Sequence, residues 1–359
     1  MQVIKYQKSH IVIMSDKKPK LLIQSKGERI FLDFCRKYPK QVIFCHKSSV
    51  TEGFEYLFNL GYKFSKRERL KQFAGEMGKL SALKFMIKLL FKLIKWRNRS
   101  FRDLHPYYNE IKSSTFLQNQ TKSSAVNINL WEELNEYAAN RWDIFKIGFT
   151  KLPTQLIFKN KFVLFRYALV FMQEMKKEKI DEAPLSTAGR EVMRVYSTLG
   201  EAVAEIARWL RKRGVRCQAN HPLGGLVCTP PLAGKAGMGW QGMHGMLITP
   251  EFGSRLRLAA IFVDQKIFET TENSDHIWIE EQCKKCRICQ KNCPTRAIQE
   301  KKTKNIDNIE VIGAMLTCID REKCFPQFYK TAGCSICIKV CPFSAGPSAY
   351  EKLKSQIVK

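Results

Sequence analysis

The sequence is poor in acidic residues and lacks an uninterrupted apolar run long enough to cross a membrane. Asp and Glu number 33 against 61 Lys and Arg, which gives a formal net charge of +28 over 359 residues. The most apolar stretch, residues 80–96, contains Lys84, Lys88, Lys92 and Lys95, whereas a membrane span needs about 20 mostly apolar residues. The basic excess predicts attraction to an anionic partner: a nucleic acid, a membrane surface or an acidic protein.

Several common signals are also missing. The first residues show neither the segments of a secretory leader nor a twin-arginine pair, so we expect a cytoplasmic protein. No Gly-x4-Gly-Lys-Ser/Thr phosphate loop occurs, and Gly237-Met238-Gly239 lacks the third glycine of a dinucleotide fingerprint. Thirteen cysteines without a leader favour metal-bound thiolates over a disulfide framework.

Charge and apolar periodicity divide the chain. Residues 1–130 hold 26 basic and 9 acidic residues, which is +17 of the net +28. Within this region the lysines of residues 80–96 lie on one helical face and apolar residues surround the rest. One interpretation is that this helix, or the basic region as a whole, lies on a membrane surface. The other is that the helix docks on the protein's own core with its lysines in water. Both interpretations stay open on sequence alone.

Beyond the polar residues 113–124 the pattern changes to alternating helices and apolar strands. A helix is predicted over 130–140, and a longer one from Ser186 or Thr187 to Arg213. Strands are predicted over the segments 144–149, 167–172 and 258–263. We therefore expect four parts: a basic, mostly helical region 1–125, an α/β (α+β) core 126–275, a cysteine-rich domain 276–350 and a tail 351–359.

The cysteine-rich part carries the strongest motif in the chain. The run Cys283-x2-Cys286-x2-Cys289-x3-Cys293-Pro is that of bacterial two-cluster ferredoxins, in which the fourth cysteine ligates the other cluster. Zinc sites instead favour separated Cys-x2-Cys pairs. The run therefore predicts [4Fe-4S] clusters.

A second, shorter run supplies the ligands that a pair of clusters requires. It reads Cys334-x2-Cys337-x3-Cys341-Pro, and it lacks one ligand, for which Cys318 and Cys324 are the candidates. The crossing rule assigns cluster one to Cys283, Cys286, Cys289 and Cys341. Cluster two then takes Cys293, Cys334, Cys337 and one of the two candidates.

The glycine-rich stretch before the cysteines carries a family resemblance. Its Ala-Gly-Met-Gly-Trp turn at 236–240, its Thr-Pro-Glu-Phe-Gly-Ser-Arg segment at 249–255 and the strand ending in Asp264 precede the cysteine runs. This arrangement resembles the corrinoid-binding iron–sulfur superfamily of reductive dehalogenases and epoxyqueuosine reductases over residues 130–345. The resemblance implies a nitroreductase-like corrinoid-binding core, followed by a double [4Fe-4S] ferredoxin-type domain, with the basic helical region as an N-terminal extension.

The resemblance also implies roles for individual residues. Dehalogenases carry a proton-donating tyrosine, an asparagine or lysine and an arginine, to which Tyr196, Asn220 and Arg255 correspond. The segment Glu322-Lys323-Cys324-Phe325 resembles a dehalogenase segment and favours Cys324 as the missing ligand, whereas Cys318 lies where epoxyqueuosine reductases place theirs. The implied contacts to a corrinoid (cobalamin) are Gly237, Gly239, Trp240, Gly242, Gly245, Leu247, Thr249 and Pro250.

Together these features predict an oxidoreductase that passes electrons through two [4Fe-4S] clusters to a corrinoid, which reduces a small organic substrate. Its expected partners are a low-potential donor of the ferredoxin or flavodoxin type and the substrate. One alternative is a tRNA-modifying reductase resembling epoxyqueuosine reductases; the basic charge suits it, but the Asp of its Val-Asp-Thr-Ala-Pro segment is missing. The other is a double-cluster electron-transfer protein without corrinoid.

Overall fold

The fold is built around a four-stranded sheet whose strands are paired in the order β2-β4-β8-β5. The computed structural model describes residues 25–44, 75–76, 78–113, 115–119, 129–158, 161–223, 225–298, 319–331 and 333–357. The strands of the sheet are β2 (Lys146–Lys151), β4 (Tyr167–Glu174), β5 (Cys217–Asn220) and β8 (Leu256–Val263).

Every pairing in this sheet is antiparallel. The core is therefore of the α+β kind, and the α/β reading of the alternating helices and strands is wrong for this sheet. Apolar periodicity reports which face of a strand is buried, but it does not report the strand's direction. β8 is buried along its whole length, since both faces of the sheet are covered.

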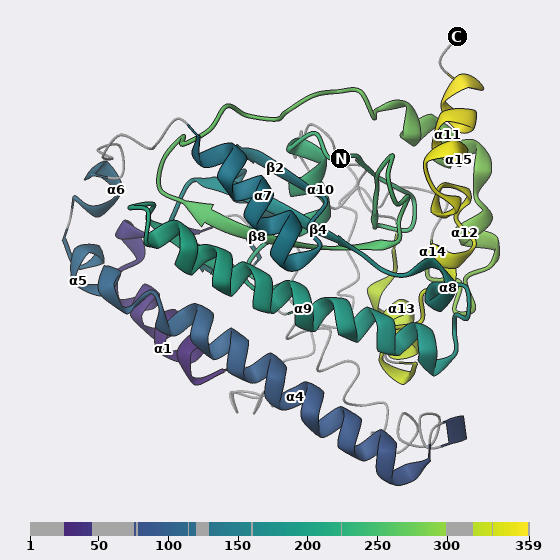
Figure 1. Cartoon of the computed structure of the whole chain (residues 1–359), viewed down its shortest axis with the longest axis horizontal. Coiled ribbons are helices and arrows are strands. Elements are labelled where there is room, and N and C mark those ends of the chain that lie inside the picture. The colour runs from purple at the N-terminus through teal and green to yellow at the C-terminus, as the bar shows by residue number, and fades with distance from the viewer. Residues whose placement is uncertain are drawn as a thin grey trace, which may run out of the picture.

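The first face of the sheet is covered by two amphipathic helices, α7 (Leu130–Trp142) and α9 (Ser186–Arg211). Leu199, Val203 and Ile206 of α9 pack against Leu169 and Ile261 of the sheet. The bounds of α7 and α9 agree with the predicted helices to within two residues. Figure 1 shows α9 running along the sheet, with α4 beyond it on the outside.

The second face is covered by α10 and by part of the N-terminal region. Phe31, Leu104 and Ile111 share an apolar cluster with Val170 and Phe262 of the sheet. The elements of this region are α1 (Lys26–Lys37), η1 (Pro39–Gln41), β1 (Ile43–Phe44), α4 (Lys79–Arg102), η2 (His105–Tyr107), α5 (Tyr108–Ile111) and α6 (Phe116–Asn119). The described part of residues 1–125 thus contributes a layer of the core and is not a separate appendage.

A buried ionic cluster ties the N-terminal layer to the core. Glu28 of α1 is fully buried, and its carboxylate accepts from Arg97 of α4 and from Lys161 at 3.0 Å. Removing one partner of such a cluster leaves a buried charge uncompensated, which typically costs about 3–5 kcal/mol. The layer is therefore held by charge as well as by apolar contact.

The remaining elements are short segments of the core and the helices of the cysteine-rich part. Short elements of the core are η3 (Thr154–Leu156), β3 (Phe162–Val163), α8 (Lys177–Ile180), α10 (Thr229–Lys235), β6 (Trp240–Gln241) and β7 (Leu247–Ile248). The cysteine-rich part consists of α11 (Trp278–Cys286), α12 (Ile288–Lys291), α13 (Arg321–Lys330), α14 (Ile336–Lys339), η4 (Pro342–Ala345) and α15 (Pro347–Ser355). Figure 1 shows these helices gathered at one end of the sheet.

Candidate functional site

Four thiols enclose a small cavity at the end of α11. Cys283, Cys286, Cys289 and Cys341 line it together with residues of the core and of η4, and its volume is about 20 Å³. The first three come from one short run in which α11 ends at Cys286 and Arg287 reverses the chain with a positive φ of 51°. These four cysteines, called thiol group one below, are the set assigned to cluster one.

The other four described cysteines of this part form a second group. Cys293, Cys324, Cys334 and Cys337 lie close enough for the charge of one thiolate to raise the pKa of its neighbours. This set, called thiol group two, contains the fourth ligand favoured by the dehalogenase resemblance. Cys318, the other candidate, lies outside the described residues.

The two groups are neighbours. The charge of a Cys289 thiolate in group one raises the pKa of Cys337 in group two, and the eight cysteines of the two groups form no disulfide. Burial raises the pKa of Cys289 and of Cys324 to about 12, so without iron these thiols hold their protons. Cluster binding would therefore release protons, because only the thiolate is a ligand.

This donor set suits two iron–sulfur cubanes. Each group offers four sulfur atoms, which is the ligand number of a [4Fe-4S] cluster. Within the described residues, no three His, Cys, Asp or Glu side chains are placed to share one metal ion. A cubane instead takes its thiolates from around a body of four irons.

Arg255 joins the sheet to the thiol-bearing part. Its guanidinium Nε donates to the carbonyl of Ser344 in η4 at 2.7 Å, and Nη1 donates to the Met175 carbonyl at 3.2 Å and to the Glu174 carboxylate. The side chain is buried and these acceptors surround it. Its observed contacts are therefore those of a structural tie, and none of them is with Tyr196.

A different arginine faces Tyr196. The guanidinium carbon of Arg257 lies 5.1 Å from the centre of the Tyr196 ring. Tyr196 stands on α9, and Arg257 lies on the face of β8 that α9 covers. Nε of Arg257 is buried and has no hydrogen-bond partner among the described residues. Sequence reasoning missed Arg257, although strand alternation from Leu258 would have placed it on this face.

Tyr196 is connected to thiol group two through an apolar cluster. Tyr196 and Cys337 pack against the same apolar cluster, which includes Met175, Val192 and Ile338. Thus α9, the sheet and α14 converge there. The structure brings Tyr196 together with the thiol-bearing part through this cluster.

Asn220 is buried at the end of β5 and makes its contacts with the following loop. Its side-chain oxygen accepts from the Leu226 amide at 2.7 Å, while Nδ2 is buried without a partner in the described structure. No contact between Asn220 and Tyr196 is found among the described residues. The adjacent His221 is also buried, and this burial lowers its pKa to about 3.

The predicted corrinoid contacts do not form an open cradle. A Cβ at Gly237 or Gly239 would lie 2.1 Å from backbone oxygens of the chain itself, and one at Gly242 would lie 2.5 Å from Ile248. Trp240, Leu247 and Thr249 are buried as well. Close packing of the chain on itself accounts for these glycines. Corrinoid contact by this set, which includes Gly245 and Pro250, stays a prediction.

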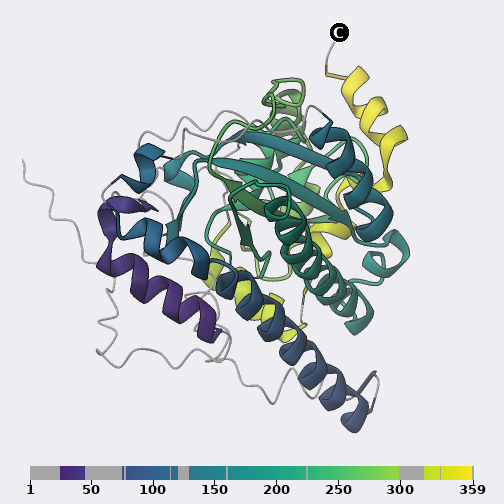
Figure 2. The same ribbon diagram turned by 60° about the vertical axis from the view of Figure 1, so that its left-hand side comes forward.

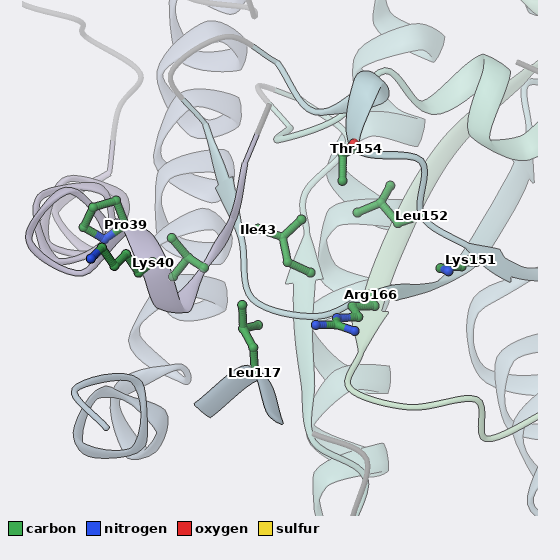
Figure 3. A pocket seen from close by; sticks show the side chains of 9 residues that line it. Pro39, Lys40, Ile43, Leu117, Lys151, Leu152, Thr154 and Arg166 are labelled. Atoms are coloured by element: carbon green, nitrogen blue, oxygen red, sulfur yellow. The ribbon is translucent and has the colours of Figure 1, made fainter. Parts of the chain in front are cut away.

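A larger cavity of about 580 Å³ lies elsewhere, between η1, β1 and the end of β2 (Figure 3). Apolar side chains such as Ile43 and Leu152 line it, and Lys40, Lys151 and Arg166 supply its positive charge. None of the predicted catalytic, metal or corrinoid residues is among its lining residues. The cavity is therefore separate from the thiol groups.

Comparisons with known proteins connect the thiol-bearing part to a named domain. Residues 282–344 match the family model described as a 4Fe-4S double cluster binding domain. This match covers all eight cysteines of the two thiol groups. It supports two [4Fe-4S] clusters in this part of the chain.

Curated relatives match larger parts of the chain. A tetrachloroethene reductive dehalogenase of Desulfitobacterium hafniense is 29% identical over 183 residues, which is 49% of this chain and 32% of that protein. An epoxyqueuosine reductase of Francisella cf. novicida (strain Fx1) is 35% identical over 126 residues, or 33% of this chain and 32% of that protein. The chain thus spans about a third of the length of these relatives.

A solved structure shows the same fold. A catabolic reductive dehalogenase in complex with 3-bromo-4-hydroxybenzoic acid superposes with a TM-score of 0.56 and 18% identity. The match covers 88% of this chain and 45% of the other. At this identity the likeness concerns the fold.

Proposed function

We propose that this chain, which belongs to the superfamily of reductive dehalogenases and epoxyqueuosine reductases, is an iron–sulfur oxidoreductase that delivers electrons to an acceptor near Tyr196. One observation carries this proposal. Tyr196 and Cys337 pack against a single apolar cluster, so the tyrosine proposed as proton donor and thiol group two share one packing unit. A reductive step that consumes both electrons and protons needs this juxtaposition.

The proposed role of the chain's own residues follows from their chemistry. The hydroxyl of Tyr196 would give a proton to a small organic substrate. The resulting phenolate costs free energy near neutral pH, because the ordinary pKa of tyrosine is about 10. The guanidinium of Arg257 lowers that cost by Coulomb attraction, and its buried Nε is an available donor.

The superfamily resemblance names a corrinoid as the acceptor, and a bound corrinoid would supply a reducible cobalt centre. Three of the contacts predicted for it, Gly237, Gly239 and Gly242, pack closely against the chain's own atoms. The packing around Gly237 and Gly239 favours a second candidate function, a double-cluster electron carrier without corrinoid.

We further propose that the electron donor approaches thiol group one. Arg287 lines the cavity of this group and is exposed on its outer side. Lys285, Lys291 and Arg296 are exposed nearby and form no ion pair within the described part of the chain. An acidic low-potential carrier of the ferredoxin or flavodoxin type fits this charge.

Metal analysis of protein purified without oxygen, with corrinoid supplied during expression, tests the main proposal. We expect about eight irons per chain for two cubanes. One bound cobalt per chain would support the corrinoid reductase. Eight irons without cobalt would leave the electron carrier, and two or fewer irons would contradict both.

Replacing Tyr196 by Phe tests the proton donor. Turnover of halogenated phenols or alkenes with a low-potential reductant should fall about 10²–10⁴-fold, which is the usual contribution of a positioned proton donor. Tyr137→Phe is the matched control, since Tyr137 lies on α7 and stacks on Trp209. Equal turnover by both variants would remove Tyr196 from the mechanism.

A further inference from the structure

The outer face of α4 exposes a stripe of large apolar side chains. Leu80, Leu83, Ile87 and Phe91 follow one another at steps of three or four residues, so they share one face of the helix. Their exposed fractions are 65%, 46%, 46% and 71%. Single exposed apolar residues are common on proteins, whereas a contiguous stripe marks an interaction surface.

Lysines border this apolar stripe. Lys84, Lys88, Lys92 and Lys95 are all exposed, and the 24 residues of α4 include no Asp or Glu. The outward side of the helix therefore combines an apolar ridge with an adjoining row of positive charge. No acidic side chain within the helix neutralises these lysines.

The opposite side of α4 is already occupied by the protein. Ala82, Leu93 and Trp96 are buried, and Leu89 packs against the apolar cluster that also contacts Tyr196. In both Figure 1 and Figure 2 the N-terminal end of α4 reaches beyond the body of the molecule. The core thus uses one side of the helix and leaves the stripe turned away from it.

We propose that this face of α4 binds the surface of an anionic lipid bilayer. The apolar ridge would enter the boundary between headgroups and acyl chains, and the lysine row would contact anionic headgroups. Charge complementarity selects an anionic partner, and the exposed Phe91 and Leu80 select one with an apolar interior. A nucleic acid would use the lysines but would leave the ridge in water.

The helix lies along the surface in this arrangement and does not cross it. None of the described helices is long and apolar enough to span a membrane. Interfacial binding of this kind depends on both apolar contact and charge, so each contribution can be removed separately.

The test is cosedimentation of the full chain with vesicles of phosphatidylcholine containing about one third phosphatidylglycerol, the anionic lipid that supplies the charge. Phe91→Ser should weaken binding at least tenfold, because burying a Phe side chain is worth about 1.5–3 kcal/mol. The matched control is Phe145→Ser, since Phe145 is 65% exposed and lies outside α4. This control should bind as the parent chain does.

The charge arm replaces Lys84, Lys88 and Lys92 by Gln. At about 1 kcal/mol per lysine the affinity should fall roughly 100-fold. Its control replaces the exposed Lys212, Lys266 and Lys352 by Gln, an equal change of charge elsewhere on the surface. Pure phosphatidylcholine vesicles should bind the parent chain weakly, and added salt should release it from the anionic ones.

The proposal is overturned if the parent chain does not sediment with anionic vesicles, or if Phe91→Ser and Phe145→Ser bind them equally. Binding of single-stranded RNA that Phe91→Ser leaves unchanged, without vesicle binding, would assign the lysines to a nucleic acid. Iron content, measured in every variant, separates loss of this surface from loss of the fold.

Discussion

The thiol-bearing part and the sheet core place their functional residues in different ways. Most cysteines of the two thiol groups come from two short runs, in which local loop geometry brings them around a common volume. Tyr196, Asn220 and Arg255 instead stand on α9, β5 and the turn before β8. Their partners depend on how separate elements pack. Spacing therefore predicted which thiols lie together, whereas it did not predict which arginine meets the tyrosine.

The largest expected effect sharpens the comparison on the thiol side. Cys324→Ala should lose one cluster, about four of eight irons, because it removes one of four ligands. Cys228→Ala is the control, since Cys228 forms no disulfide and lies outside both thiol groups. Iron analysis and electron paramagnetic resonance of the reduced protein measure the result.

The same measurement on Cys318→Ala completes this test. We expect that variant to keep all of its iron. Loss of iron from Cys318→Ala together with full retention in Cys324→Ala would show that thiol group two lacks its true fourth ligand.

A second test addresses the two arginines of the core. Arg257→Met keeps the bulk of the side chain but removes the charge beside Tyr196, so turnover should fall about 10²-fold or more. Its melting temperature should change little. Arg255→Met should change turnover little. It should lower the free energy of unfolding by about 2 kcal/mol, because it removes the hydrogen bond to Ser344 and the partly buried ion pair with Glu174.

Turnover and thermal unfolding, measured on both variants, separate the two roles. If Arg255→Met lost turnover at unchanged stability while Arg257→Met kept it, the role implied for Arg255 by the family resemblance would be the right one.

A third test concerns the contact between α9 and the loop after β5. Gly200→Ala would ordinarily stabilise a helix by about 1 kcal/mol. Here the added Cβ would lie 1.9 Å from Nε2 of the buried His221. We expect a net loss of about 1–3 kcal/mol, the usual cost of overpacking. Chemical denaturation measures it, and Gly200→Ala combined with His221→Ala should recover part of the loss.

The smallest expected effect is a pH dependence at the end of β8. Burial raises the pKa of Asp264 to about 6, although Arg216 opposes this shift. The folded state therefore binds more protons than the unfolded state between about pH 4 and 6, and the contribution of Asp264 to stability falls as pH rises through that range.

Asp264→Asn removes this titration. The variant should be more stable than the parent chain at pH 7.5, by about 1 kcal/mol after allowance for the lost ion pair with Arg216, and the difference should vanish near pH 4. Thermal unfolding at both pH values measures it, with the exposed Asp275→Asn as control. A constant difference at all pH values would show that Asp264 does not titrate as described.

Most of the secondary structure of the core was predictable from the sequence. The predicted strand 167–172 lies within β4, and the predicted long helix agrees with α9, because apolar periods of two and near 3.6 residues report local conformation directly. β5 was missed, since its four residues, Cys217–Asn220, are too short to show a period. The direction of the strands was missed because no local pattern encodes it.

The sequence by itself determined which cysteines are grouped, apart from the choice between Cys318 and Cys324. It also determined the helical character of α4 and its row of lysines. Each of these is a matter of spacing along one short segment. Only the tertiary structure decided that Arg257 faces Tyr196, that Arg255 ties the sheet to η4, and that the glycines at 237 and 239 meet the chain's own backbone. These contacts join residues far apart in the chain, and their geometry depends on the packing of whole elements, which no local pattern of residues specifies.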